Sequence, residues 1–138
     1  MNKGFQEIAD AFLEKLRIAW DASDAGAYGA LFTEDATYVI FIGEALIGRE
    51  EIERNHVDVF ARWQRDSKMA VKAIAIRPLT AEVCSVLTIG GIGEHHPTAY
   101  DKLQTFTLVQ RAGSWLCAAF QNTAMSHEAK SRYNDGLA

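Results

Sequence analysis

His56 is the residue of this sequence best suited to acid-base chemistry. It follows Ile52 by four residues and precedes Phe60 by four, so the three side chains share the inward face of a predicted helix. An imidazole titrates near neutral pH and can act as a general base or acid toward a ligand. The alternative is a core histidine whose ring bonds a neighbouring side chain or carbonyl, because buried polar groups nearly always find partners. Both interpretations stay open at this point.

Further side chains are candidates for the same pocket. Tyr38 and Trp20 offer a hydroxyl and an indole N–H, although aromatic residues at helix and strand periods also build ordinary cores. Asn122 offers an amide that can orient a carbonyl, or else a side chain that bonds the backbone at a strand end. We therefore expect two groups, candidate catalytic residues and pocket-lining residues: His56, Asn122 and Tyr38 in the first, and Trp20, Phe60 and Gln121 in the second.

Two adjacent histidines, His95 and His96, lie in a glycine-rich segment with Glu94 and Asp101 nearby. Adjacent histidines rarely reach one ion, and the sequence has no three-ligand spacing such as His-Glu-x-x-His. The glycines of residues 90–93 are not followed by a helical pattern, so they do not form a phosphate-binding fingerprint. The sequence thus predicts no metal and no organic cofactor. A loop of this length is expected to form the rim of the pocket.

Composition limits the classes of protein and partner. The chain has 138 residues, 49% of them hydrophobic and 23% charged, which fits one globular domain and excludes disordered chains. The net charge is -4 and no basic stripe is present, which argues against a nucleic-acid partner. No apolar run approaches the roughly 20 residues that span a bilayer, and the N-terminal segment lacks an export pattern. We predict no membrane association and a cytoplasmic location.

Helices come first among the elements that must position these residues. Apolar residues recur at steps of three and four over 5–20 and again over 49–63. Asp24 can cap a second, shorter helix that ends near Phe32. Asp35 is then expected in the turn before the first strand, where its carboxylate bonds local backbone.

Strands follow the helices. β-branched and aromatic residues predict a strand at 36–42 and a short extended piece between Gly43 and Gly48, and four more strands come later, at 69–77, 82–92, 103–111 and 115–123. Cys84 and Cys117 lie in these apolar stretches and are expected to be buried thiols. The order predicts one α+β domain at 1–124, with helices on one face of a curved, mostly antiparallel sheet, and a C-terminal tail at 125–138.

The predicted strands are apolar on both faces. In the strand at 82–92, one parity carries Val83 and Leu87, and the other carries Cys84 and Val86. Helices can cover only one of these faces, and a large exposed apolar patch is unusual in a soluble monomer. We therefore predict a homodimer formed through the sheet.

The chain resembles the nuclear transport factor 2-like superfamily, in particular its SnoaL-like branch and the SgcJ/EcaC group. The resemblance covers roughly residues 5–123. It rests on Trp-Asp-Ala-Ser-Asp at 20–24, Leu-Phe-Thr-Glu-Asp-Ala at 31–36, Gly-Arg-Glu-Glu-Ile at 48–52, and Trp-Leu-Cys-Ala-Ala-Phe-Gln-Asn-Thr at 115–123. The resemblance implies a cone-shaped, cystatin-like α+β barrel with a pocket at its wide end and dimers made through the sheet. Members of this superfamily have many functions, so the fold does not settle the function.

The mechanisms known in the superfamily do not transfer to this chain. Ketosteroid isomerase uses a tyrosine and an aspartate base, and the resemblance places Leu16 and Ile40 at those two positions. Polyketide cyclases carry an acid on a late strand, where this chain has Gln121 and Asn122, which cannot take up a proton.

Three hypotheses remain. The leading one is a small-molecule-binding protein with an apolar conical pocket, suited to an aromatic or polycyclic ligand, with no assignable reaction. The second is a cofactor-free isomerase, cyclase or dehydratase in which His56 is the base and Asn122 or Tyr38 the oxygen donor. The third is a dimeric interaction module whose cavity is filled by its own side chains. An open pocket lined by His56 would favour the first two.

Overall fold

The computed structural model describes residues 4–94 and 98–135 of the chain. Its elements follow in the order α1 (Phe5–Asp21), α2 (Ala25–Gly29), β1 (Phe32–Ile40), β2 (Glu44–Ile47), α3 (Arg49–Asp58), the π-helix η1 (Val59–Trp63), β3 (Lys68–Thr80), β4 (Val83–Gly93), β5 (Lys102–Arg111), β6 (Ser114–Ala124) and α4 (His127–Asn134). The strands form one sheet in the order β2-β1-β6-β5-β4-β3. β1 and β6 pair in parallel, and the other neighbours are antiparallel.

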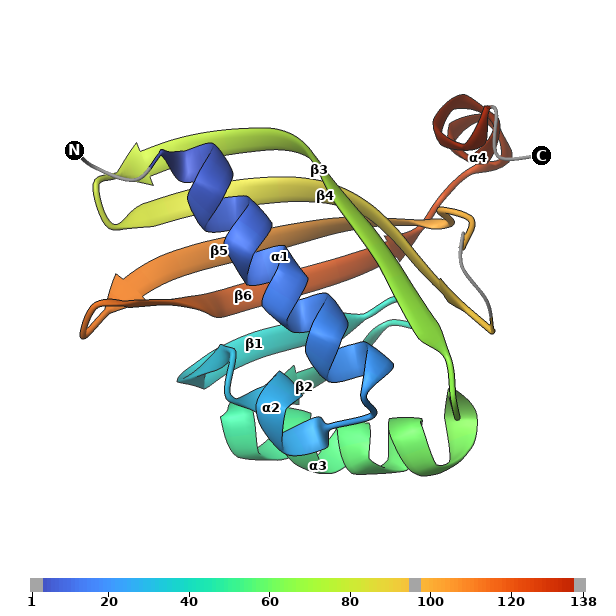
Figure 1. Cartoon of the computed structure of the whole chain (residues 1–138), viewed down its shortest axis with the longest axis horizontal. Coiled ribbons are helices and arrows are strands. Elements are labelled where there is room, and N and C mark those ends of the chain that lie inside the picture. The colour runs from blue at the N-terminus through green and yellow to red at the C-terminus, as the bar shows by residue number, and fades with distance from the viewer. Residues whose placement is uncertain (1–3, 95–97, 136–138) are drawn as a thin grey trace.

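α1, α2 and α3 lie on one side of the curved sheet, and α4 lies beyond its end (Figure 1). Figure 1 shows α1 crossing one face of the sheet, with α2 and α3 packed together beside β1 and β2. This arrangement confirms the predicted α+β cone. The sheet is mixed rather than antiparallel throughout, because β1 enters beside β6 in the parallel direction.

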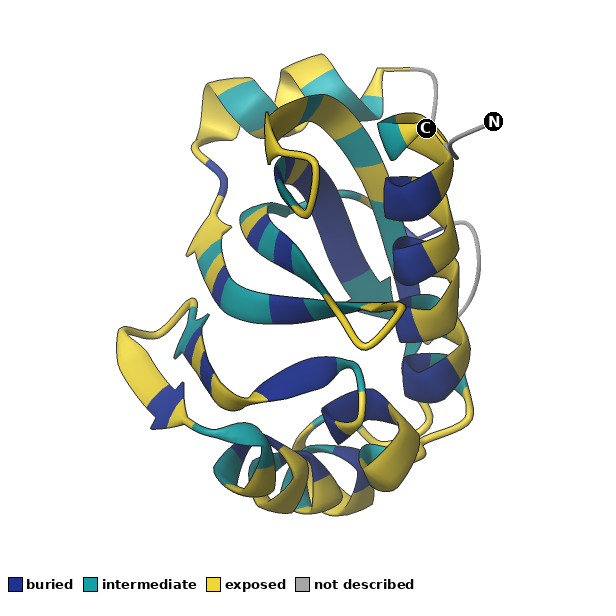
Figure 2. Cartoon of the chain, turned by 90° about the vertical axis from the view of Figure 1, so that its left-hand side faces the viewer, coloured by how far each residue is buried: buried dark blue, intermediate teal, exposed yellow. Residues whose placement is uncertain are grey.

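A continuous apolar stripe fixes α1 against the sheet. Figure 2 shows its buried residues as dark bands on the side that faces the strands, with exposed residues on the opposite side. Burying a large apolar side chain contributes about 1.5–3 kcal/mol, so this stripe is a major source of stability. Its buried members are Ile8, Ala9, Phe12, Leu13, Leu16, Ala19 and Trp20.

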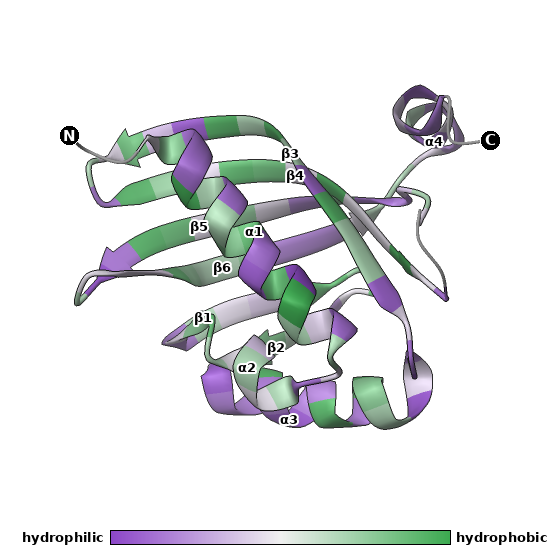
Figure 3. Ribbon diagram, viewed as in Figure 1, coloured by the Kyte–Doolittle hydropathy of each residue, from purple (hydrophilic) through white to green (hydrophobic). Residues whose placement is uncertain are grey.

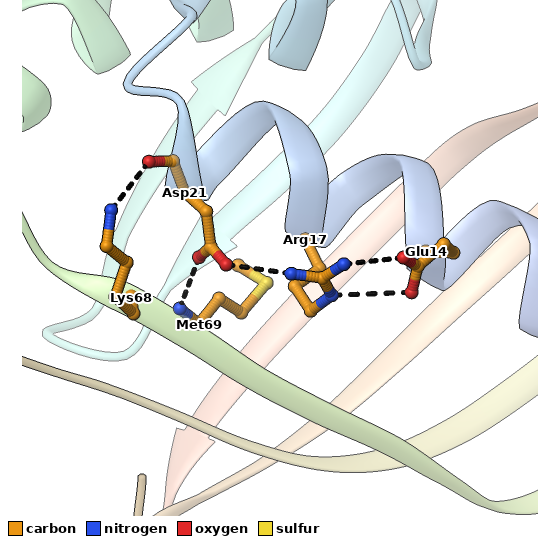
Figure 4. A network of polar contacts seen from close by, with 5 residues as sticks. All are labelled: Glu14, Arg17, Asp21, Lys68 and Met69. Atoms are coloured by element: carbon orange, nitrogen blue, oxygen red, sulfur yellow. Dashed lines mark hydrogen bonds and ion pairs between the residues drawn. The ribbon is translucent and has the colours of Figure 1, made fainter. Parts of the chain in front are cut away.

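A polar network ties the end of α1 to the start of β3 (Figure 4). The Asp21 carboxylate accepts hydrogen bonds from the Met69 backbone N–H at 2.8 Å and from Arg17 at 2.9 Å. The Lys68 ammonium donates to the Asp21 carbonyl oxygen at 3.0 Å. Arg17 also pairs with Glu14 one turn earlier. These bonds hold α1 and β3 together beside Trp20, which is part of the site described below.

Aromatic side chains fill the interior over one part of β5 and β6, and polar side chains replace them further along the same strands. Phe12 of α1 packs edge-on against Phe106 of β5, and Phe106 packs against Phe120 of β6, with ring centroids 5.8 and 4.8 Å apart. Two residues further along the same face of β5 and β6 come Gln104 and Asn122, which are paired in the sheet register. The predicted burial of Cys84 and Cys117 as free thiols is confirmed.

The first strand begins earlier than the sequence indicated. β1 starts at Phe32 rather than at 36, and Asp35 lies within the strand, so its predicted place in a turn is wrong. The early residues belong to the strand because Phe32 already pairs with Cys117 of β6, and an irregularity of register follows before Thr37. Asp35 still bonds locally, since the Thr33 hydroxyl donates to it at 2.9 Å and this bond lowers the pKa of its carboxyl.

The C-terminal segment forms a helix. α4 is capped by the Ser126 side chain, and Asn134 bonds both the N–H and the carbonyl of Tyr100 at 2.7 Å. Figure 3 shows that α4 is mostly hydrophilic, in agreement with its lack of buried residues. Among the described helices, none combines the length and the apolar character needed to cross a membrane.

Candidate functional site

A cavity of about 620 Å³ lies between the helices and the concave face of the sheet. This volume falls within the roughly 300–1,000 Å³ that is usual for small-molecule sites. The wall is rich in aromatic rings, contributed by Trp20, Tyr28, Tyr38, Phe41, Trp63, Phe106 and Phe120. His56, Asn122, Tyr38 and Trp20, which the sequence singled out, all line it.

His56 and two tyrosines form a hydrogen-bonded chain on the helical wall of the cavity. His56 Nδ1 lies 2.7 Å from the carbonyl oxygen of Ile52, and Nε2 lies 3.2 Å from the Tyr38 hydroxyl. That hydroxyl lies 2.8 Å from the hydroxyl of Tyr28. Both ring nitrogens of His56 therefore have protein partners, and the residue is only 2% exposed.

The hydrogen bonds from Tyr28 through Tyr38 to His56 have a fixed donor-to-acceptor direction. A carbonyl oxygen can only accept, so Nδ1 of His56 carries the proton that is donated to Ile52, and Nε2 accepts from the Tyr38 hydroxyl. Tyr38 in turn accepts from Tyr28. Burial lowers the pKa of His56 to about 4, although the bond to Ile52 acts in the opposite direction. Burial also raises the pKa values of Tyr28 and Tyr38 above the usual range, so all three groups are neutral at pH 7.

Trp20 presents its ring rather than its N–H. The indole Nε1 donates to the Ser67 hydroxyl at 2.9 Å, and that hydroxyl donates to the carbonyl oxygen of Gln64. The sequence suggested this indole N–H as a ligand contact, but it is already bonded within the protein. The aromatic face of Trp20 remains as part of the cavity wall.

Phe60 is buried behind the cavity and does not line it, which corrects the sequence prediction. Its ring packs edge-on against Trp20 with centroids 5.0 Å apart, and it also contacts the rings of Tyr28 and His56. Phe60 keeps the inward orientation that the helical spacing predicted, although the chain changes from α3 to the π-helix η1 at Val59. Val59 and Trp63 line the cavity in its place.

The sheet wall carries a row of polar side chains across three strands. Thr88 of β4, Gln104 of β5 and Asn122 of β6 are neighbours in the register. The Thr88 hydroxyl donates to Gln104 Oε1 at 2.9 Å. Gly90 makes room for this amide, because a Cβ there would lie 2.5 Å from Gln104 Oε1. Within the described part of the chain, Asn122 Oδ1 is buried and has no hydrogen-bond partner.

Gln121 points away from the cavity, so its predicted place in the lining is also wrong. Successive side chains of a strand alternate between the two faces of the sheet, and Phe120 and Asn122 take the inner face of β6. Gln121 is accordingly exposed on the outer face, beside Thr105 of β5.

The rim of the cavity is charged and aromatic. Lys102 Nζ lies 2.9 Å from Asp101 Oδ2 and 4.6 Å from the centre of the Phe41 ring. The segment predicted to form this rim is only partly described, because His95 and His96 lie outside the described residues. Among residues 4–94 and 98–135, no cluster of three or more His, Cys, Asp or Glu side chains has the arrangement needed to hold a metal ion.

Sequence reasoning missed Gln104 and Lys102. The signal for Gln104 was its place two residues before Phe106, which makes it a polar residue on the inner face of an apolar strand. Leu16 and Ile40 both line the cavity. They give the cavity apolar surface on α1 and at the end of β1.

No family model matches the chain, and no curated protein matches it. Solved structures do. A domain of unknown function with a cystatin-like fold from Nostoc punctiforme is 19% identical, with a TM-score of 0.81 over 98% of this chain and 86% of that chain. A ketosteroid isomerase-like protein from Erwinia carotovora atroseptica is 19% identical, with a TM-score of 0.72 over 91% of this chain and 99% of that chain.

An NTF-2 like protein of unknown function from Shewanella oneidensis is 13% identical, with a TM-score of 0.74 over 86% of this chain and 98% of that chain. At these identities the likeness concerns the fold. The cystatin-like, nuclear transport factor 2-like fold predicted from the sequence is therefore confirmed.

Proposed function

We propose that this chain is a SnoaL-like small-molecule-binding protein of the SgcJ/EcaC group, and that its ligand is an apolar, aromatic compound. The observation that carries the proposal is the 620 Å³ cavity with its aromatic wall. Rings such as those of Phe106 and Phe120 favour offset or edge-on contacts with a second ring system. The apolar residues Leu16 and Ile40 add to the same lining.

The bonds of His56 favour binding over proton abstraction by this residue. Its Nε2 already accepts a hydrogen bond from Tyr38, and a pKa of about 4 makes the ring a weak base. A ligand proton would have to reach His56 through the Tyr38 hydroxyl. We therefore propose a binding role for the cavity and assign no reaction to it.

Equilibrium dialysis with naphthalene tests the binding role. We expect saturable binding to the natural chain and at least a tenfold weaker affinity for Ile40→Trp, which places a larger ring inside the cavity. Ile47→Trp is the matched control, because Ile47 is 61% exposed on β2 and lies outside the lining. Equal binding by both variants, or no binding by the natural chain, would contradict the proposal.

We further propose that the chain forms a homodimer through the outer face of the sheet. Val83, Leu87 and Val109 belong to the face opposite Val86 and Phe106, and Leu87 is 37% exposed. Contact with a second copy would cover these side chains. Light scattering at micromolar concentration should give twice the 15.3 kDa mass of one chain, and a mass of one chain would overturn the dimer.

A further inference from the structure

The sheet wall of the cavity contains a buried acceptor that has no hydrogen-bond partner among the described residues. In the described part of the chain, two buried side-chain oxygens have no hydrogen-bond partner, Asn122 Oδ1 and Asp101 Oδ1. Both residues line the same cavity. An unpaired buried polar atom loses its hydration without a compensating bond, so such atoms are rare in folded proteins and call for an explanation. Both are acceptors, which points to a ligand that brings donors.

A donor lies directly beside one of these acceptors. Gln104 is the cross-strand neighbour of Asn122 and belongs to the same face of the sheet. Its Oε1 is occupied by the Thr88 hydroxyl, which orients the amide and leaves the NH₂ group as the part available to a ligand. Residues paired across antiparallel strands have Cβ atoms about 4.5–5.5 Å apart, close enough for one small group to contact both amides.

The two amides are neighbours on the cavity wall, so a small ligand group between them can meet the unpartnered Asn122 Oδ1 and the NH₂ group of Gln104. A hydroxyl group matches this pair, because its single oxygen both donates and accepts. The hydroxyl would donate to Asn122 Oδ1 and accept from Gln104 Nε2. The rings of Phe106 and Phe120 lie two residues along the same strands, where they can hold the aromatic skeleton that carries the hydroxyl.

We infer that the ligand of this cavity is a hydroxylated aromatic compound of the phenol class, whose hydroxyl group binds between Gln104 and Asn122. This inference rests on the proposed binding function and makes it specific. On the helical wall a phenol would find less to bind, since the Tyr38 hydroxyl already donates to His56 and the Trp20 N–H already donates to Ser67.

Three probes of similar size test the inference by equilibrium dialysis. 2-Naphthol can donate and accept, 2-methoxynaphthalene can only accept, and naphthalene can do neither. We expect the natural chain to bind 2-naphthol about tenfold more tightly than 2-methoxynaphthalene, the change that corresponds to one added hydrogen bond near the top of its usual range. Asn122→Leu should abolish this preference and leave naphthalene binding within about twofold.

Two further variants sharpen the result. Gln121→Leu makes a closely similar change on the outer face of the same strand and should keep the full preference for 2-naphthol. Gln104→Glu removes the NH₂ donor while still accepting from Thr88, and should weaken 2-naphthol at least tenfold. Circular dichroism establishes that each variant is folded before its binding is compared.

The outcomes separate the two proposals. If naphthalene binds but 2-naphthol gains nothing over it, or if Asn122→Leu keeps the preference, the inference is wrong and the apolar binding site stands. If none of the three probes binds, the proposed function and the inference fail together.

Discussion

The two polar walls of the cavity differ in how completely their hydrogen bonds are satisfied. On the helical wall, both ring nitrogens of His56 are bonded, and the hydroxyls of Tyr28 and Tyr38 complete the chain. On the sheet wall, Asn122 Oδ1 has no partner within the described residues. A satisfied network stabilises a core, whereas an unsatisfied group is retained at a cost. On our proposal, the difference separates residues that stabilise the fold from residues that bind a ligand.

The largest effect is expected on the helical wall. His56→Ala should lower the free energy of unfolding by about 2–4 kcal/mol, because it creates a void and leaves the Tyr38 hydroxyl without its acceptor. In a domain of this size the midpoint of thermal unfolding should fall by about 7–14 °C. Thermal melting followed by circular dichroism measures this.

A small shift would reverse the interpretation of His56. If the midpoint of His56→Ala fell by less than about 4 °C, the ring would contribute little to packing. His56 would then be better described as a pocket residue in contact with solvent, and the contrast between the two walls would disappear.

The next largest effect is a pH dependence of stability. The pKa of His56 is lowered to about 4 in the folded chain, from an ordinary value of 6.5. Between these two values the unfolded chain binds a proton at this residue and the folded chain does not. The stabilisation is therefore present above pH 6.5 and is lost as the pH falls toward 4, by about 2 kcal/mol at pH 5.

Urea unfolding at pH 7.5 and pH 5 measures this loss. The comparison is with His56→Gln, which removes the titrating ring and should show a loss that is smaller by about 2 kcal/mol over the same interval. The same loss in both proteins would mean that His56 titrates normally in the folded state.

The smallest effect on stability is expected on the sheet wall. Asn122→Leu removes an unpaired buried oxygen and substitutes an apolar group of similar size, so the free energy of unfolding should change by less than about 0.5 kcal/mol or rise. Thermal melting beside His56→Ala gives the comparison directly. A destabilisation of 2 kcal/mol would show that Asn122 is held by the protein after all.

Sequence periodicity was sufficient to predict the main helices and strands and part of the site. Steps of three and four predicted α1 and placed His56 facing inward, because that spacing follows directly from helix geometry. The same spacing also placed Phe60 on the inner face, where its ring contacts that of His56, but periodicity does not distinguish a residue that lines the cavity from one packed behind its wall.

The polar row on the sheet was beyond sequence reasoning for a different reason. Gln104 and Asn122 are 18 residues apart, and only the register of β5 and β6 brings them together. Alternation along the strand could have separated Gln121 from Asn122, since the face that carries Phe120 is the inner one. That step required knowing which of two apolar faces is covered by α1.

The central claim, that an aromatic guest binds inside the cavity, is tested most directly by titrating ¹⁵N-labelled protein with naphthalene and following the backbone amide signals. The account predicts that the largest shifts occur at cavity-lining residues such as Ile40, Phe106 and Asn122. A shallower groove between α1 and β3, at Asp10 and Lys72, serves as the internal reference and should be unaffected. Shifts confined to that groove, or no shifts at a saturating concentration of naphthalene, would contradict the account.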